Sequence, residues 1–99
     1  MDQKVALITG GARGIGKGIA LDLAAQGCSI AICYRTSERD AQVTTTAIHK
    51  RGGQAVAICC DVSNPQACLG LVEQIEEKWG KIDVLVNGAG PYHLSLIHI

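Results

Sequence analysis

The stretch Thr9–Gly16, TGGARGIG, is the part of this chain best suited to bind a phosphate group. Its spaced glycines suit three tasks. Gly10 permits a tight turn, Gly14 lets the backbone approach a ligand, and Gly16 lets a helix pack closely on a strand. At the start of a helix, free backbone N–H groups and the helix dipole favour an anion. The stretch therefore predicts a turn that binds phosphate.

A second phosphate-binding pattern overlaps this turn. Gly11, Gly16 and Lys17 match G-x-x-x-x-G-K, the start of the phosphate loop of nucleoside triphosphatases. In that loop the next residue is a Ser or Thr that holds magnesium, whereas this chain has Gly18. The missing hydroxyl disfavours the triphosphatase interpretation.

Four short apolar runs supply the strands that would position such a turn. They are KVALIT at 4–9, SIAICY at 29–34, QAVAICC at 54–60 and IDVLV at 82–86. Short apolar runs bounded by glycine or polar residues are typical of strands that are buried on both faces.

A first helix is expected from Gly14, directly after the glycine-rich turn. Its apolar residues recur at four-residue spacing and predict one buried face, made of Ile15, Ile19 and Leu23 with Ala20 and Ala24 beside them. Gly27 is the expected C-terminal stop.

Two more helices are expected between the later strands. Ser37 with Asp40 resembles a capping box that opens the second helix, which would end at Gly52 and Gly53. The third helix could be capped by either Ser63 or Asn64, with Pro65 in its first turn and Gly80 after its end. Its expected apolar face consists of Cys68, Val72, Ile75 and Trp79.

The resulting order, β-α-β-α-β-α-β with short links, predicts an α/β chain. Apolar strands that alternate with one-faced helices imply a parallel sheet covered on both sides. Right-handed crossovers then give the N-terminal part of a doubly wound parallel (Rossmann) sheet, truncated after the fourth strand. The glycine-rich stretch falls at the first strand-to-helix turn, which makes its pattern far more specific.

Three motifs in this order resemble those of the short-chain dehydrogenase/reductase family. They are Thr9–Gly16 after the first strand, Asp61 and Val62 after the third, and Asn87–Gly90, NGAG, after the fourth. The resemblance covers residues 4–90 and is nearest to the branch that includes 3-oxoacyl-(acyl carrier protein) reductases. It implies an oxidoreductase that transfers hydride between a nicotinamide cofactor and a carbonyl or alcohol substrate.

The resemblance also implies which residues bind the cofactor. The glycine-rich stretch would line the pyrophosphate and adenosine ribose, the aspartate would accept a hydrogen bond from the adenine amino group beside the valine, and the fourth-strand motif would border the ribose and hold that strand in the sheet. In that order the residues are Gly10, Arg13, Gly14, Ile15 and Gly16; Asp61 and Val62; and Asn87, Ala89 and Gly90. Gly88 departs from the commoner second Asn, so only backbone contacts can remain there.

The choice of cofactor is expected to depend on the end of the second strand. An acidic residue there accepts hydrogen bonds from a free ribose 2′-hydroxyl, whereas an Arg favours a 2′-phosphate. Arg35 follows Tyr34 directly, and no Asp or Glu occurs before Glu38. Arg13 would approach the same ribose from the glycine-rich turn. We therefore expect NADP(H) rather than NAD(H).

The family's catalytic Tyr and Lys, spaced Y-x-x-x-K and assisted by a Ser, have no match in this chain. Tyr34 is followed four residues later by Glu38 and Tyr92 by Leu96, and the last lysine is Lys81. We therefore expect no catalytic residue here, cofactor binding at best, and activity only in the full-length protein. A non-catalytic dinucleotide-binding sensor or interaction module is the alternative.

Residues 94–99, LSLIHI, resemble the translation of CTG-TCT-CTT-ATA-CAC-ATC, a transposon end used as an adapter in sequencing libraries. After the N-x-A-G turn, a natural chain should continue into a helix. We therefore expect residues 1–93 to be a partial NAD(P)-binding domain and residues 94–99 to be an adapter-derived artefact. The fourth strand would then be left as an open sheet edge.

Composition excludes several classes of protein. The formal net charge is zero and only 18% of residues are charged, which gives no electrostatic footprint for nucleic acid or an anionic membrane. No apolar run approaches the roughly 20 residues of a membrane span, and the start MDQKVALITG lacks the apolar region of a signal peptide. We expect a cytoplasmic protein whose full-length form takes a small-molecule carbonyl or alcohol and forms a homo-oligomer.

The cysteines do not fit a disulfide framework or a metal site. Their number is odd, none forms C-x-x-C, and the chain starts without a signal peptide. Cys33, Cys59 and Cys60 fall in expected strands, where a free thiol behaves as a small buried apolar group. We expect reduced thiols and no metal site for the five, which are Cys28, Cys33, Cys59, Cys60 and Cys68.

Overall fold

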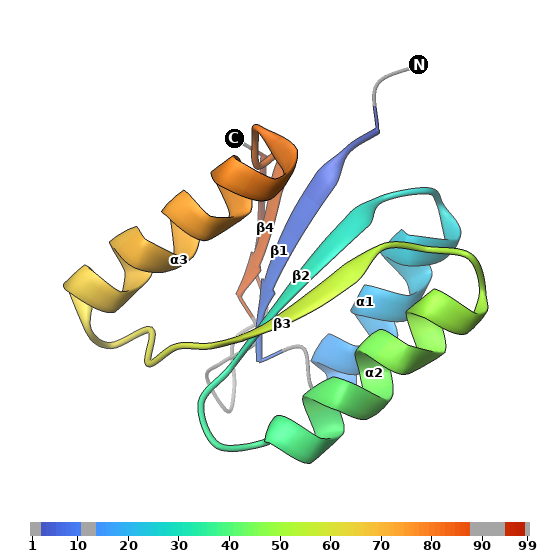
Figure 1. The fold of residues 1–99 in the computed structure, drawn as a ribbon, viewed down its shortest axis with the longest axis horizontal. Coiled ribbons are helices and arrows are strands. Elements are labelled where there is room, and N and C mark those ends of the chain that lie inside the picture. The colour runs from blue at the N-terminus through green and yellow to red at the C-terminus, as the bar shows by residue number, and fades with distance from the viewer. Residues whose placement is uncertain (1–2, 11–13, 88–94, 99) are drawn as a thin grey trace.

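The computed structural model describes residues 3–10 and 14–87, together with the backbone of residues 95–98. From β1 to β4, strands and helices alternate as predicted (Figure 1). The elements are β1 (Val5–Thr9), α1 (Gly14–Ala25), β2 (Ser29–Tyr34), α2 (Glu38–Lys50), β3 (Ala55–Cys59), α3 (Pro65–Trp79), β4 (Val84–Asn87) and β5 (Ser95–His98).

The strands form one sheet in the order β3-β2-β1-β4-β5. β1 pairs in parallel with β2 on one side and with β4 on the other, and β2 pairs in parallel with β3. Ile8, for example, lies opposite both Ile32 of β2 and Val86 of β4. The chain therefore winds outward from β1 in both directions, which confirms the predicted α/β doubly wound sheet.

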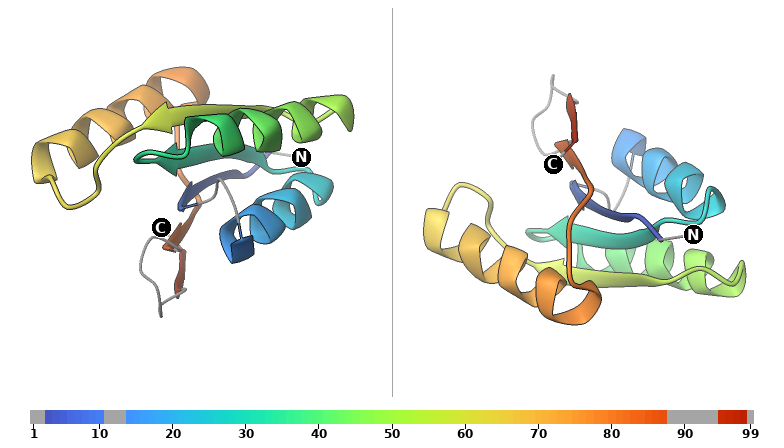
Figure 2. Two further views of the ribbon diagram at one scale, coloured as in Figure 1. Left: turned by 90° about the horizontal axis from the view of Figure 1, so that it is seen from below. Right: turned by 90° about the horizontal axis from the view of Figure 1, so that it is seen from above.

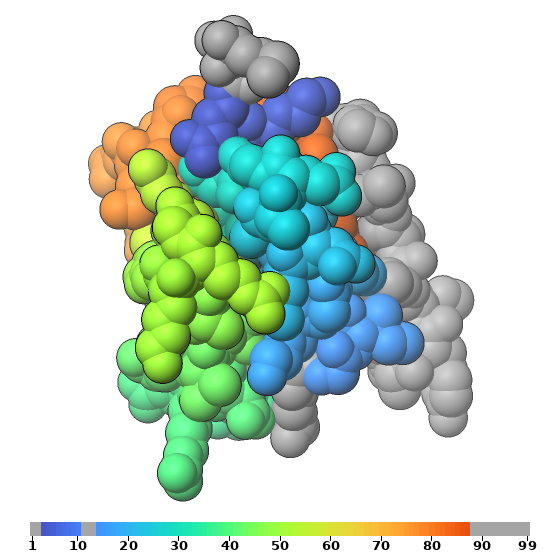
Figure 3. All heavy atoms as spheres, turned by 90° about the vertical axis from the view of Figure 1, so that its right-hand side faces the viewer, coloured from blue at the N-terminus to red at the C-terminus, as the bar shows by residue number. Residues whose placement is uncertain are grey.

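The helices form two layers on opposite faces of the sheet. α1 and α2 cover one face and α3 covers the other (Figure 2). α1 and α2 lie side by side, and their side chains form a continuous surface over the sheet (Figure 3). Among the described residues, no helix is both long and apolar enough to cross a membrane.

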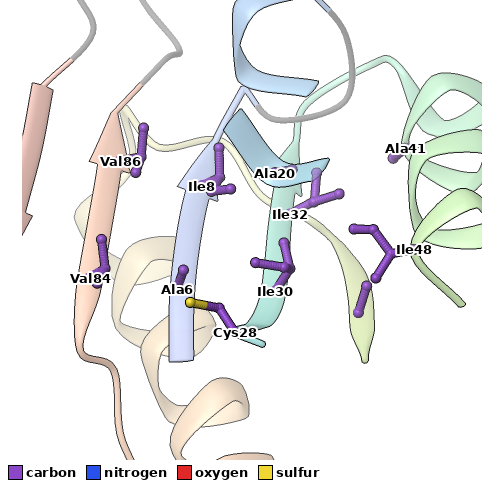
Figure 4. Close-up of a cluster of buried hydrophobic side chains, with 11 residues drawn as sticks. Ala6, Ile8, Ala20, Cys28, Ile30, Ile32, Ala41, Ile48, Val84 and Val86 are labelled. Carbon is purple, nitrogen blue, oxygen red and sulfur yellow. The ribbon is translucent and has the colours of Figure 1, made fainter. Parts of the chain in front are cut away.

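Alternate side chains of the central strands contribute to two separate cores, because successive residues of a strand point to opposite faces. The core under α1 and α2 includes Ala6, Ile8, Ala20, Ile30, Ile32 and Ile48 (Figure 4). The core under α3 includes Val5, Leu7, Ala31, Cys33, Cys60, Leu71 and Ile75. Both cores include side chains of β1 and β2, so these two strands are packed on both faces of the sheet.

The apolar face predicted for α1 is only partly correct. Ile19 and Leu23 pack against the core, but Ile15 is 72% exposed. The residues of α1 that are fully buried are Gly16 and Ala20, which therefore mark the side of the helix that faces the sheet. Ile15 lies about 100° around the helix axis from Gly16, so it points away from the sheet.

The capping box predicted at the start of α2 is wrong. Ser37 precedes the helix, but its side chain makes no capping hydrogen bond. Its backbone, at φ −92° and ψ 54°, is outside the extended conformation that a capping serine normally adopts.

Of the two residues predicted as possible caps of α3, Ser63 and Asn64, it is Asn64 that caps the helix. Its side-chain oxygen accepts hydrogen bonds from the backbone N–H groups of Gln66 at 2.9 Å and Ala67 at 3.3 Å. Pro65 occupies the first turn, and Gly80 ends the helix in a left-handed conformation at φ 81°.

Cys59 differs from the prediction because β3 is an edge strand. Cys33 and Cys60 are buried as expected, but Cys59 is exposed. β3 has a neighbour on its β2 side only, and the exposure of its side chains increases from Ala55 to Cys59. Cys59 is the last residue of this edge strand, and its side chain is left in contact with solvent.

The expectation of an open edge at β4 is also corrected. β5 pairs with β4 in the antiparallel sense, with Ser95 opposite Asn87 and His98 opposite Val84. This pairing satisfies backbone N–H and C=O groups that an edge strand would expose. The origin of residues 94–99 as an adapter-derived artefact stays a prediction.

Candidate functional site

Gly10 directly follows β1, and Gly14 is the first residue of α1. Gly10 has φ 72° and Gly14 has φ 64°, both in the left-handed region that L side chains rarely adopt. The Gly10 N–H donates a 3.0 Å hydrogen bond to the carbonyl of Cys33, which ties the turn to β2. Apart from its chain neighbours and the backbone of α1, no described atom lies within 4 Å of a Cβ placed on Gly14. Arg13 lies outside the described residues.

A pocket of about 250 Å³ lies where β1, β2 and β3 end. It is lined by Gly10, Cys33, Tyr34, Arg35, Cys60, Asp61, Val62 and Ser63. Four of these, namely Gly10, Arg35, Asp61 and Val62, are residues that the sequence nominated from three separate segments. The sheet order brings them together, because β1, β2 and β3 are neighbours whose carboxyl ends share one edge.

Asp61 is held in this pocket by Ser63. One carboxylate oxygen accepts hydrogen bonds from the Ser63 hydroxyl at 2.7 Å and from the Ser63 backbone N–H at 3.0 Å. These two bonds, the hydroxyl first, lower the pKa of Asp61, and nearby Arg35 adds to the effect. Asp61 is therefore an ionised hydrogen-bond acceptor at neutral pH. The sequence analysis considered Ser63 only as a possible helix cap, although an Asp two residues before a Ser is a recognisable turn signal.

Arg35 stands at the mouth of the same pocket. Its Nε lies 4.0 Å from the second carboxylate oxygen of Asp61, and 76% of the Arg35 side chain is exposed. An ion pair this long and this exposed contributes little free energy. The guanidinium can therefore leave Asp61 for a stronger anionic partner at small cost.

Asn87 joins the carboxyl ends of β1 and β4. The Thr9 hydroxyl lies 3.0 Å from the Asn87 side-chain oxygen, to which it donates, and 3.4 Å from the Val86 carbonyl. This hydrogen bond links β4 to β1, and the role that the resemblance implied for Asn87 stays a prediction. Thr9 belongs to the glycine-rich motif but was not predicted to be a site residue, although its hydroxyl makes the hydrogen bond to Asn87.

Asn87 borders a second pocket, on the α3 side of the sheet. This pocket holds about 280 Å³ and is lined by Leu7, Thr9, Val62, Cys68, Leu71, Val72, Leu85 and Asn87. Val62, in the loop after β3, lines both pockets. Ala89 and Gly90 lie outside the described residues. Among those that are described, no three His, Cys, Asp or Glu side chains are placed to hold a metal ion.

Ile15 and Gly16 occupy the first turn of α1. Gly16 is buried against the sheet, as its predicted packing role requires. Ile15, by contrast, is exposed to solvent at the start of α1.

Comparison with known proteins gives a consistent result. The sequence profile of a family described as short chain dehydrogenase matches residues 4–98. Over 87 residues the chain is 42% identical to the short-chain dehydrogenase/reductase homolog YusS of Bacillus subtilis, covering 88% of this chain and 80% of that protein. Over 90 residues it is 45% identical to hydroxynaphthalene reductase arp2 of Aspergillus fumigatus, covering 91% of this chain and 33% of that protein.

A solved structure that resembles this chain comes from the same family as these relatives. A short chain dehydrogenase from Burkholderia cenocepacia, in complex with NADP, superposes with a TM-score of 0.85 at 43% sequence identity. The match covers 91% of this chain and 37% of that one. The chain therefore spans about a third of the length of the Aspergillus and Burkholderia proteins.

Proposed function

The chain belongs to the short-chain dehydrogenase family, and on that premise we propose that it is the cofactor-binding N-terminal part of an NADP(H)-dependent oxidoreductase. The observation that carries the proposal is the pocket at the ends of β1, β2 and β3, which gathers Gly10, Arg35 and Asp61. Gly10 belongs to the turn expected to bind phosphate, the Arg35 guanidinium suits a 2′-phosphate, and the ionised Asp61 suits the adenine amino group. The pocket therefore suits one nucleotide.

The adenine end of the cofactor would occupy the pocket beside Asp61. The Asp61 carboxylate is ionised and fixed by Ser63, so it can accept a hydrogen bond from the adenine amino group. Val62 offers an apolar side chain that is 38% exposed beside it. Burial of that surface under the flat ring would remove apolar area from water.

The pyrophosphate would lie at the start of α1. The start of a helix suits an anion, because its first backbone N–H groups have no partner within the helix. Ile15 would cover it from the solvent side, and Arg13 would approach the adenosine ribose.

Cofactor choice would follow from Arg35. Its guanidinium is exposed and only weakly paired, so a ribose 2′-phosphate can recruit it. We therefore propose NADP(H) over NAD(H) for the full-length protein. The NADP seen with the Burkholderia relative is consistent with this choice.

When bound, the nicotinamide cofactor would donate or accept the hydride exchanged with a carbonyl or alcohol. The 99 residues contain no Y-x-x-x-K, so we propose that this chain binds cofactor without catalysing that exchange. For the full-length protein we propose a small-molecule substrate, a cytoplasmic location, homo-oligomeric assembly and, within the family, a place near the 3-oxoacyl-(acyl carrier protein) reductases.

The test is a calorimetric titration of the 99-residue chain with NADPH, together with the variants Asp61→Ala and Asp22→Ala. Asp22 is a matched control, because it is an exposed aspartate of α1 that does not line the pocket. We expect Asp61→Ala to weaken binding several-fold and Asp22→Ala to leave it unchanged. An unmodified chain that is folded by circular dichroism but gives no saturable NADPH binding would refute the proposed function.

A further inference from the structure

Residues 61–64, between β3 and α3, form a turn in which the two carboxylate oxygens of Asp61 have different surroundings. The Oδ1 atom accepts two hydrogen bonds from Ser63, one from the hydroxyl at 2.7 Å and one from the backbone N–H at 3.0 Å. The Oδ2 atom lies 4.0 Å from the Arg35 Nε, which is beyond hydrogen-bond distance. One oxygen is therefore fixed to the turn, and the other is available to a ligand in the pocket.

The turn that carries Ser63 is itself anchored to α3. The Asp61 carbonyl accepts a 3.0 Å hydrogen bond from the Asn64 backbone N–H, which closes the turn. Asn64 also caps α3, because its side-chain oxygen accepts a 2.9 Å hydrogen bond from the Gln66 backbone N–H. Ser63 lies between these two bonded positions. Its hydroxyl therefore donates to the carboxylate from a defined place in the fold.

Without Ser63, the Asp61 carboxylate would be free to rotate. The Asp61 side chain is 44% exposed, and its contact with Arg35 is too long and too exposed to fix it. Ordering one mobile side chain when a ligand binds lowers the affinity by about two- to ten-fold. The two hydrogen bonds of Ser63 set the orientation of the carboxylate before the ligand arrives, so most of this loss is avoided.

We propose that Ser63 is a positioning residue that sets the base specificity of this pocket, so that a 6-aminopurine is preferred to a 6-oxopurine. This inference rests on the proposed function, in which adenine lies beside Asp61. With Oδ1 held by Ser63, Oδ2 accepts an N–H of the 6-amino group. A 6-oxopurine such as hypoxanthine has an oxygen acceptor at that position, and two facing acceptors share no proton. Both oxygens would then lose hydrogen bonds to water without replacement, which weakens binding.

The first experiment measures, by calorimetry, the affinity of the 99-residue chain for NADPH and for its 6-oxo analogue, reduced nicotinamide hypoxanthine dinucleotide phosphate. The two ligands share the phosphates, the riboses and the nicotinamide, so an effect on those parts cancels in the ratio of their dissociation constants. We expect the unmodified chain to prefer NADPH by about ten-fold or more, which is the effect of one hydrogen bond to a charged group. Equal affinities would overturn the proposal.

The second experiment repeats this comparison in Ser63→Ala, which removes the hydroxyl, and in Ser63→Thr, which keeps it. Ser37→Ala is the matched control, because Ser37 precedes α2, makes no capping hydrogen bond and does not line the pocket. We expect Ser63→Ala to reduce the preference for NADPH by about two- to ten-fold, and the other two variants to retain it. An equal loss of affinity for both ligands in Ser63→Ala would mean that the hydroxyl only stabilises the turn, and would overturn the proposal.

Asp61→Asn tests the same geometry in a chain that keeps Ser63. The two Ser63 donors should select the amide oxygen of the new side chain, so that its NH₂ group takes the place of Oδ2 and faces the ligand. We therefore expect the preference to reverse in favour of the 6-oxo analogue. A chain that still prefers NADPH after Asp61→Asn would overturn the proposal, whether or not Ser63→Ala folds.

These measurements separate the positioning role of Ser63 from the proposed function. A folded, unmodified chain that binds neither ligand would overturn the proposed function, and the base specificity with it. A chain that binds NADPH ten-fold more tightly than the analogue, but keeps that full preference in Ser63→Ala, would overturn the role of Ser63 alone. In that case cofactor binding by the pocket would stand.

Discussion

Replacing Arg35 with Ala tests the proposed cofactor preference most directly. In the structure this side chain is 76% exposed and lies 4.0 Å from Asp61, a pair whose loss costs at most about 1 kcal/mol of folding free energy. The hydrogen bonds of Ser63, rather than Arg35, are the main reason for the lowered pKa of Asp61. Arg35→Ala should therefore leave the fold and the adenine acceptor intact.

The expected effect on NADPH is much larger than the effect on stability. A hydrogen bond to a charged group contributes about 1.5–3 kcal/mol. Since about 1.4 kcal/mol corresponds to a factor of ten in a dissociation constant, Arg35→Ala should weaken NADPH binding by about ten- to a hundred-fold. NADH has no 2′-phosphate, so its affinity should change by less than about two-fold.

The assay is isothermal titration calorimetry of the 99-residue chain with each cofactor, at low and at moderate salt. Arg39→Ala is the matched control, because Arg39 is an exposed arginine of α2 outside the pocket. The NADPH advantage should also shrink with added salt, as expected for a charge at an exposed site. Equal weakening of NADPH and NADH by Arg35→Ala would mean that Arg35 acts through Asp61. An unchanged preference would mean that the end of β2 does not select the cofactor.

Two further predictions concern stability and activity. Asp83 accepts a 2.8 Å hydrogen bond from the Val5 backbone N–H, which is the main cause of its lowered pKa. Its contribution to stability should therefore be complete above its usual pKa of 3.8 and be lost as the pH falls through the lower folded value. Urea unfolding should show Asp83→Asn to be destabilising at pH 7 and nearly neutral at strongly acidic pH, and an equal effect at both would contradict this reasoning. The purified 99-residue chain should not oxidise NADPH with any carbonyl substrate in a spectrophotometric assay. A rate proportional to its concentration would show that the missing Y-x-x-x-K is not required.

Local sequence patterns were sufficient for the elements from β1 to β4. The apolar run at 29–34 coincides with β2, and α1 begins at Gly14 as predicted. The positive φ angles at Gly10 and Gly14 were also foreseeable, because a tight turn and an open approach require glycine. Such features depend on neighbours within a few residues, so a pattern in the chain contains the necessary information.

The details of individual caps and exposures were less predictable. Ser37 had the right residue type and spacing for a cap but not the backbone conformation, whereas Asn64 had both. Cys59 and Cys60 are adjacent in an apolar run, yet one is exposed and the other buried. Their difference depends on β3 being an edge strand, which no local pattern specifies.

The sequence by itself determined the strands β1 to β4, the three helices and the chemical types of the candidate residues. Only the tertiary structure decided which of them share a pocket. Gly10, Arg35 and Asp61 meet because β1, β2 and β3 are neighbours in the sheet. Strand order and helix packing are fixed by burial between segments that are far apart along the chain, and this burial exists only once the whole sheet has formed.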